Sequence, residues 1–342
     1  MINTIIIIFG LFSIVAFLSP DNKEVKQFVY IFLGIILIFI AGFRGEGVDR
    51  DYENYVELFY ENDYLLVEPS FVIITTAIRS LGLQDVIYIF IVFSILGVSI
   101  KFIAIKQLSQ LWFLSIVIYL SNFFLLHEMT QIRAGIASGF LLLCIKPIYD
   151  RNWKKFLLFA TLGFSFHYSA LLIFPLWFIG KKAHKKILFL SIPVAYIIYF
   201  SQINLIGVLP IPGIQQKLEV YKQLQDLGGE QWNSINVFNL LFLARIAIFY
   251  FILLKYDLIL ANNKYLPILI KIYCIALISF LIFAVMPVLA FRMNELFGIV
   301  EVVLIPLLFY VFRPRLISKI VIVFIGVCLI SIVLFYNKLL IF

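Results

Sequence analysis

The sequence predicts an all-α fold, a polytopic membrane helical bundle with about ten spans plus re-entrant or broken helices. Of the 342 residues, 63% are hydrophobic and 13% are charged, and the mean hydropathy is +1.07. Soluble domains are about half apolar and about a quarter charged. Uncharged stretches such as 31–41 and 320–336 approach or reach the roughly 20 residues of one helical crossing. They are apolar on every face, which favours helices over the alternating strands of a membrane barrel.

We expect residues 1–342 to form one membrane domain with a helix over each long apolar stretch, because only internally paired backbones are stable in hydrocarbon. The N-terminal stretch resembles a signal peptide but has no basic n-region and no small-residue cleavage site, so we expect it to be a retained span. In chain order the expected spans are 2–19, 25–42, 84–100, 111–126, 132–147, 187–200, 237–254, 266–285, 298–312 and 320–336.

Loop charge places two further apolar stretches, 69–82 and 156–180. Basic loops of membrane proteins stay on the cytoplasmic side. If Lys23 and Lys26 are cytoplasmic, every basic loop is cytoplasmic only when both stretches begin and end on the same side of the membrane. The second stretch is then a hairpin broken near His167. The alternative treats both stretches as simple spans and leaves Lys101 and Lys106 outside.

The favoured arrangement gives two long external loops. The first, 43–83, is rich in acidic residues and contains the re-entrant segment. The second, 201–236, contains glycine and proline and an amphipathic middle, and fits either a substrate-facing lid or a plain solvated loop. The shorter segments 127–131 and 286–297 are also external. The net charge of +8 then follows from membrane orientation, and we expect no nucleic-acid partner.

The chain lacks the strong motifs of soluble enzymes and of metal sites. It contains no GxGxxG, Walker, CxxC or HExxH pattern. Its cysteines, Cys144, Cys274 and Cys328, lie in apolar stretches without metal-ligand spacing, so we expect neither disulfides nor a metal. The chemistry must therefore come from the few ionisable residues near the membrane, each of which costs roughly 2.5–3.5 kcal/mol to insert and usually has a role.

Arg44 follows the second span in a glycine-rich segment that also carries Asp49 and Asp51. Glycine allows close backbone approach, and an arginine near two carboxylates suits an anionic substrate together with a base. The other interpretation is an arginine that reaches from a helix end into the interface.

Arg133 and His127 flank the start of the fifth span, where a helix N-terminus attracts anions. Gln131 is four residues from His127 and shares its helix face. His167 lies at the required break in 156–180. For both histidines, an ordinary structural role is the alternative to a catalytic one.

Arg245 lies deep in a span and needs a carboxylate or a ligand as its partner. Arg292 follows Pro287 at an external helix boundary, and Glu301 is the expected internal partner of an arginine. The arginines at 44, 133, 245 and 292 are thus expected to converge toward one side of the membrane. Guanidinium is always charged and matches phosphate, so the pattern indicates a ligand with a diphosphate and a lipid tail.

The same residues are arranged as in a known family. The chain resembles the EpsG/Wzy group of bacterial polysaccharide polymerases, most closely over about 40–180, and a late arginine of the family matches Arg292. The elements that carry the resemblance are Arg44-x-x-Gly47-x-Asp49-x-Asp51-Tyr52-x-x-Tyr55, Glu68-Pro69-x-Phe71, Gln131-Ile132-Arg133-x-Gly135-Ile136-Ala137 and Phe166-His167-Tyr168-Ser169-Ala170. The family usually has one aspartate before the tyrosine, whereas this chain has two.

The resemblance implies a multi-pass protein of the bacterial inner membrane, similar in architecture to C-type glycosyltransferases. It implies a polymerase of undecaprenyl-diphosphate-linked oligosaccharide repeat units, acting at the outer face, with a flippase and a chain-length regulator as partners and no cofactor. The product would be O-antigen, capsule or exopolysaccharide. Within the matched motifs, Glu68 and Gln131 join the expected substrate-binding residues.

In the expected mechanism a hydroxyl of a new unit attacks C1 of the growing glycan, and a lipid diphosphate leaves. Arg133 and Arg292 would contact the diphosphate, with Arg44 and Arg245 in support. Asp49 or Asp51 is the first choice of general base, and His167 or His127 the second. A flippase of the same lipid-linked glycan and an acyltransferase are the alternatives, and the glycan ladder of a deletion strain discriminates among the three.

Overall fold

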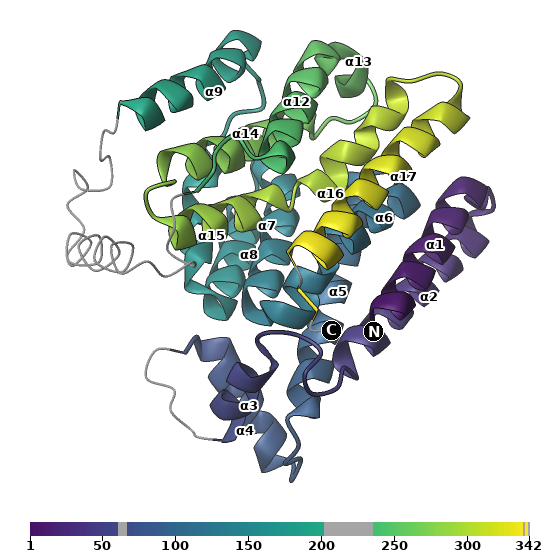
Figure 1. The fold of residues 1–342 in the computed structure, drawn as a ribbon, viewed down its shortest axis with the longest axis vertical. Helices are drawn as coiled ribbons and strands as arrows, with labels where there is room; N and C mark the ends of the chain where they lie inside the picture. The colour runs from purple at the N-terminus through teal and green to yellow at the C-terminus, as the bar shows by residue number, and fades with distance from the viewer. Residues whose placement is uncertain (61–66, 202–234, 338, 341–342) are drawn as a thin grey trace.

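The computed structural model describes residues 1–60, 67–201, 235–337 and 339–340. Within these residues the chain is helical and has no strand, apart from one isolated antiparallel bridge between Asp49 and Leu340. This confirms the all-α prediction. Figure 1 shows a bundle of helices with α3 and α4 forming a smaller lobe beyond one end. The expected loop 201–236 falls almost entirely outside the described residues.

Every stretch predicted as a span coincides with helical structure. The first half of the chain forms α1 (Ile2–Leu18), α2 (Lys23–Gly42), α3 (Tyr52–Tyr60), α4 (Pro69–Ser80), α5 (Ile87–Leu108), α6 (Trp112–Asn122), the π-helix η1 (Leu125–Thr130), α7 (Ile132–Asp150), α8 (Trp153–Phe166) and the 3-10 helix η2 (Tyr168–Phe178). The second half forms α9 (Lys185–Phe200), α12 (Leu240–Leu254), α13 (Tyr256–Leu260), α14 (Leu266–Ile282), α15 (Pro287–Gly298), α16 (Glu301–Leu304), η4 (Ile305–Tyr310), α17 (Arg315–Ser331) and η5 (Ile332–Tyr336).

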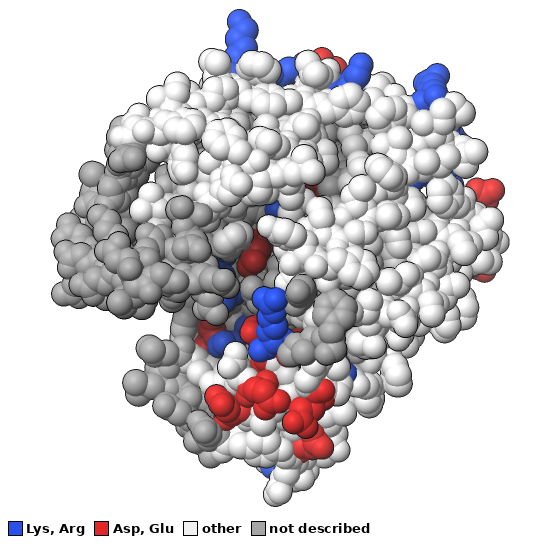
Figure 2. Space-filling view, in the orientation of Figure 1, with Lys and Arg blue, Asp and Glu red and all other residues white. Residues whose placement is uncertain are grey.

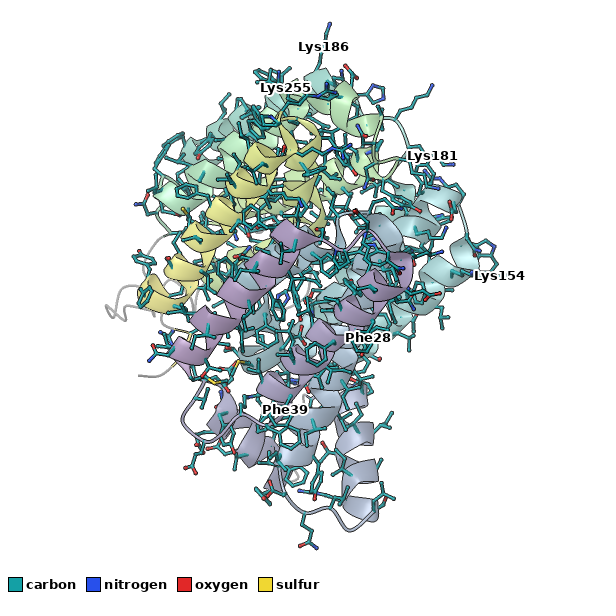
Figure 3. The ribbon with its side chains drawn as sticks, turned by 90° about the vertical axis from the view of Figure 1, so that its right-hand side faces the viewer. Phe28, Phe39, Lys154, Lys181, Lys186 and Lys255 are labelled. Atoms are coloured by element: carbon teal, nitrogen blue, oxygen red, sulfur yellow. The ribbon has the colours of Figure 1, made fainter. Side chains whose placement is uncertain are left out.

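In the described part of the chain, four helical segments are long and apolar enough to cross a membrane: α2, α5, α7 and the continuous Arg315–Tyr336. Shorter apolar helices accompany them. Helix α15 is neither one of these shorter apolar helices nor a candidate span. Large apolar side chains face outward, as in a membrane protein. Phe28 and Phe39 on α2 are 72% and 62% exposed, and Figure 3 shows both on the outer surface of the bundle. The total of about ten spans stays a prediction.

Helix α7 lies at the centre of the bundle. Of its most apolar 18 residues, 78% are buried inside the protein, whereas the corresponding share is 33% in α2 and in Arg315–Tyr336. It packs against α5 on one side and α8 on another. Its first residues therefore sit where several helices end, which places Gln131 and Arg133 next to side chains from distant parts of the sequence.

The basic loops gather at the end of the bundle opposite the α3–α4 lobe, which comprises the described residues of 43–86. Figure 3 shows Lys154, Lys181, Lys186 and Lys255 along the upper and right-hand edges, away from the lobe at the bottom. Short contacts join these loops to one another. They are Lys26 and Lys106 over the Trp112 ring, Asn263 to the Leu108 carbonyl, Lys271 to the carbonyls of Gly180 and Lys182, and Lys319 to the Phe17 carbonyl. This is the grouping that the favoured membrane orientation requires.

Helix α8 and η2 form a hairpin that starts and finishes at the basic end. Arg151, before α8, donates hydrogen bonds of 2.7 Å to the carbonyls of both Trp177 and Ile179, after the return. The chain reverses at His167, whose extended backbone ends α8 and begins η2. The break therefore lies at the residue where loop charge predicted it.

A buried ion pair fixes the π-helix η1 in the centre. The Lys101 ammonium lies 2.5 Å from the Glu128 carboxylate, and neither side chain is more than 1% exposed. Lys101 also donates to the Gly135 carbonyl, and the Tyr119 hydroxyl donates to the same Glu128 oxygen. Removing either charge would leave the other unpaired in an apolar interior, which is far more costly than the pair itself.

Gly135 permits the close approach of α7 to η1. A Cβ at this position would lie 2.1 Å from the His127 carbonyl oxygen, a backbone atom that cannot rotate away. This explains why the Gln-Ile-Arg-x-Gly element needs glycine at its fifth position. The requirement is steric, because Gly135 is not among the positive-φ glycines of the described chain.

We expect Gly135→Ala to destabilise the protein by about 1–3 kcal/mol, the usual range for overpacking a filled interior. Thermal unfolding of the purified protein in detergent measures this. Gly10→Ala is the matched control, since a Cβ on Gly10 in α1 meets nothing within 4 Å. Equal melting temperatures for the two variants would contradict the packing argument.

Candidate functional site

Charged residues from seven elements gather between the bundle and the α3–α4 lobe. Figure 2 shows a recess at this level, in which both acidic and basic side chains are visible. The residues around it come from the segment after α2, the starts of α4 and α7, the break between α8 and η2, and the helices α12, α15 and α16.

Arg44 and Asp49 form an ion pair that is inaccessible to solvent. The Arg44 Nε lies 2.7 Å from Asp49 Oδ2, and both side chains are 0% exposed. The guanidinium also stacks over the Phe90 ring at 3.8 Å and donates to the Ala41 carbonyl at 3.0 Å. Its Nη2 has no hydrogen-bond partner. Asp49 in turn accepts a hydrogen bond from the Asp51 backbone, so the pair shapes the loop that carries Asp51.

Asp51 lies among three arginines. Burial and the nearby charge of Asp49 raise the pKa of Asp51, against the opposing charges of Arg292, Arg133 and Arg44. Of the two aspartates that the sequence offers as a base, Asp51 is the partly exposed one, whereas Asp49 is committed to Arg44. Burial also raises the pKa of Asp49, although the Arg44 charge opposes this.

Glu68 joins Arg133 to His167. Its Oε2 pairs with Arg133 Nη1, and its Oε1 lies 2.5 Å from His167 Nδ1. Glu68 precedes Pro69 at the start of α4, so the proline-initiated helix holds the carboxylate at the lobe–bundle boundary. Burial would raise the pKa of Glu68, but the hydrogen bond with His167 and the Arg133 charge outweigh it and the pKa is lowered. Glu68 is therefore ionised.

Arg292 is held by an amide rather than by a carboxylate. Its Nη1 donates to Gln131 Oε1 at 2.7 Å. Arg44, Arg133 and Arg245 each have a carboxylate oxygen within 4 Å, whereas Arg292 has none among the described residues. Arg292 therefore has no direct ion-pair partner within the described residues, although Asp51 and Glu295 lie close enough to interact with its charge.

Glu295 lies one turn beyond Arg292 on α15. Burial raises the pKa of its carboxyl to about 7, although Arg292, a hydrogen bond with Gln131 and the Arg245 charge oppose the shift. Its Oε2 is shielded from solvent without a hydrogen-bond partner. Glu295 thus titrates near neutrality, one turn from Arg292, which has no carboxylate within 4 Å in the described residues.

Arg245 pairs with Glu301, which confirms the expectation that Glu301 would serve an arginine. Its Nε lies 3.0 Å from Glu301 Oε1. Asn122 donates to Glu301 at 2.8 Å and accepts from Arg245 at 3.5 Å, while Asn294 accepts from Arg245 at 3.4 Å. This group joins α6, α12, α15 and α16, and its members are mostly buried.

His127 is 1% exposed and is held within the protein. Its Nδ1 lies 3.1 Å from the Ser138 hydroxyl, which donates its own proton to the Gly135 carbonyl. Among the predicted residues, the structure leaves six partly exposed: Asp51, Gln131, Arg133, His167, Arg245 and Arg292. It buries the other four, Arg44, Asp49, Glu68 and His127.

Sequence reasoning passed over several residues that shape the site. Lys101 was used only as an orientation marker, although a lysine inside an otherwise apolar helix is itself a signal of a buried partner. Asn122 gave the same signal more weakly. Asn294 was indistinguishable from ordinary polar residues. Tyr55 belongs to the first matched motif, but only the fold places its ring centroid 5.9 Å from the Arg133 guanidinium. No cluster of three or more metal-ligating side chains lies in the described parts of the chain.

The chain is similar to known proteins over most of its length. A sequence model described as the EpsG family matches residues 27–341. The chain belongs to the EpsG family. The amylovoran biosynthesis protein AmsC of Erwinia amylovora is 25% identical to this EpsG protein over 269 residues, covering 72% of this chain and 71% of AmsC. No solved structure matches the chain. The predicted family resemblance is thereby confirmed, whereas the likeness to C-type glycosyltransferases stays a prediction.

An arginine paired with a buried carboxylate and an arginine bound to an amide should contribute differently to the stability of this EpsG protein. Arg44→Ala leaves Asp49 buried and unpaired, a change that costs about 3–5 kcal/mol in other proteins. Arg292→Ala removes only a bond to an amide. We expect a clearly lower melting temperature in detergent for Arg44→Ala than for Arg292→Ala. The reverse order would show that the Arg44–Asp49 pair is dispensable.

Glu295 should make stability depend on pH. Because its pKa in the folded protein, about 7, is raised above the ordinary carboxyl value, its contribution is present at low pH and is lost as the pH rises through about 7. The fall in melting temperature between pH 5.5 and pH 8 should therefore be smaller in Glu295→Gln than in the unmodified protein. An equal fall in both would place the titration elsewhere.

Proposed function

We propose that this EpsG protein is a polysaccharide polymerase that joins oligosaccharide repeat units carried on undecaprenyl diphosphate. The single observation that carries the proposal is Arg292, a partly buried guanidinium without a carboxylate within 4 Å in the described chain, beside Arg133 and Asp51. A guanidinium held by an amide at one nitrogen keeps its charge and its remaining planar N–H donors available to a phosphate.

The reaction is block transfer of the growing glycan. An acceptor hydroxyl forms a bond to C1 of the donor sugar, the C1–O bond to the lipid diphosphate breaks, and the bonding electrons leave with the diphosphate. Negative charge grows on the departing oxygen, so preorganised guanidinium groups lower the transition state more than the ground state. Arg292 and Arg133 hold the diphosphate, and Arg44 and Arg245, each paired with a carboxylate, support the site behind them.

The proposed side of the membrane is the outer one, and the lipid tail lies along the bundle. The described basic loops lie at the opposite end of the bundle from the α3–α4 lobe, and basic loops stay cytoplasmic. The arginines gather at the lobe end, where lipid-linked units delivered by a flippase would arrive in the bacterial inner membrane. The amylovoran relative supports a surface polysaccharide as the product. A chain-length regulator is the further partner that the proposal includes.

A flippase of the same lipid-linked glycan is the competing function. It would need charged residues along a path between both faces. The four arginines instead gather at one end, and the deeper Lys101–Glu128 pair is saturated by its own partners. Transfer at one face therefore accounts better for where the charges lie.

Arg292→Ala and Arg133→Ala should each reduce polymer formation by about 100-fold or more, the loss typical of removing one donor to a developing oxyanion. The measurement is the glycan ladder of a deletion strain complemented with each variant, with membrane content checked by immunoblot. Arg315→Ala is the matched control, because Arg315 is exposed at the start of α17, near the basic end.

The ladder separates the candidate functions. A polymerase defect leaves glycan capped at a single repeat unit. Loss of all surface glycan would indicate a flippase, and a normal ladder with altered modification would indicate an acyltransferase. Long chains of normal length in the Arg292→Ala strain would overturn the assignment of the arginines.

A further inference from the structure

His167 occupies a position that the backbone itself defines. Its amide donates to the Gly163 carbonyl and closes α8, while its own carbonyl accepts from the Ala170 amide and opens η2. The extended backbone between these bonds makes the helix reverse and presents the imidazole at the lobe end of the bundle. The side chain is 20% exposed, so part of it reaches solvent.

The contact with Glu68 settles which ring nitrogen carries the proton. Glu68 is ionised because the hydrogen bond with His167 and the Arg133 charge outweigh the effect of burial on its pKa. A carboxylate can only accept hydrogen bonds, so the His167 Nδ1 at 2.5 Å must be the donor. In the neutral imidazole, Nε2 then carries the free lone pair, as in other carboxylate–histidine pairs.

The other candidate bases are less suited to proton transfer. Asp49 is fully buried in its pair with Arg44, and His127 is 1% exposed, with its Nδ1 at the Ser138 hydroxyl. Asp51 lies among three arginines, and within the described residues no hydrogen bond or ion pair orients its carboxylate. Among these candidates His167 alone combines partial exposure with a direct contact to an orienting carboxylate.

We propose that His167 is the general base of the transfer and that Glu68 is its positioning residue, linking the base to the diphosphate-binding Arg133. This rests on the proposed polymerase function. In the step, Nε2 of His167 takes the proton of the acceptor hydroxyl as the oxygen bonds to the donor C1, and the electron pair of the broken C1–O bond leaves with the lipid diphosphate. The imidazolium is stabilised by Glu68 and later returns its proton to water.

The charged side chains around the base belong to three elements. Helices α4, α7 and α15 all pack against α8 or η2. Their charged side chains at the lobe end are Glu68 at the start of α4, Arg133 on α7, and Arg292 and Glu295 on α15. Glu68 contacts the imidazole directly, and Arg133 reaches it through Glu68.

The test separates binding from chemistry with purified protein and a defined undecaprenyl-diphosphate-linked repeat unit. His167→Asn is the central variant, because its side-chain amide can still donate to Glu68 but offers no equivalent of Nε2. We expect it to bind undecaprenyl diphosphate within about threefold of the unmodified protein and to polymerise about 100-fold or more slowly. His184→Ala, an exposed histidine before α9, is the matched control.

The role of Glu68 has its own readout. Glu68→Gln should lower kcat and move the acidic limb of the pH–rate profile to lower pH, since the amide no longer stabilises the imidazolium. Glu68→Asp should restore part of the rate and the original limb. If Glu68→Gln lowers the melting temperature but leaves the acidic limb of the pH–rate profile unchanged, Glu68 is only a structural residue. That result would overturn its positioning role.

The two proposals fail in different ways. If His167→Asn polymerises at a near-normal rate while Arg292→Ala shows the expected loss of polymerisation, the base assignment is overturned. The proposed polymerase function then stands. Undiminished binding of undecaprenyl diphosphate and normal polymerisation by Arg292→Ala and Arg133→Ala would overturn the assignment of the arginines. Failure of the unmodified protein to polymerise the defined lipid-linked unit would overturn the proposed function itself.

Discussion

The buried ion pair of Lys101 and Glu128 is the interaction on which the rest of the arrangement depends. Around Glu128, contacts come from the segment after α2 through Arg44, from α5 through Lys101 and from α6 through Tyr119. Lys101 also binds the Gly135 carbonyl at the start of α7. In an apolar interior two charges are tolerated only when each is fully paired, so these helices can meet in essentially one way. The pair therefore sets the position of η1.

The position of η1 determines where the site residues emerge. The π-helical turn ends at Gln131, and α7 begins directly after it, so Gln131 and Arg133 leave the bundle together. Gln131 fixes Arg292 on α15, and Arg133 fixes Glu68 on α4, which in turn fixes His167. A structural pair with no access to substrate thus determines the geometry of the groups that face the recess.

Sequence reasoning predicted what depends on local pattern and missed what depends on packing. Hydropathy located the helices because insertion into hydrocarbon is a property of each stretch, and loop charge located the break at His167 because orientation is a property of each loop. The partners Arg44 and Asp49 are five residues apart, so their proximity was visible. Arg133 and Glu68 are 65 residues apart, and Arg245 and Asn122 are 123 apart. Such pairings follow from helix packing, which no single segment encodes.

The resting site is close to electrically neutral, and this constrains how it can take a diphosphate. Arg44, Arg133 and Arg245 are compensated by Asp49, Glu68 and Glu301, and clustering four uncompensated guanidinium groups in a partly buried site would be costly. Under the proposed function, the ligand meets one available cation, Arg292, and draws on Arg133 by competing with Glu68. Glu68 can release Arg133 because His167 remains as its partner, and its charge is then directed at the imidazole. Binding of the diphosphate and activation of the base are coupled through this one carboxylate.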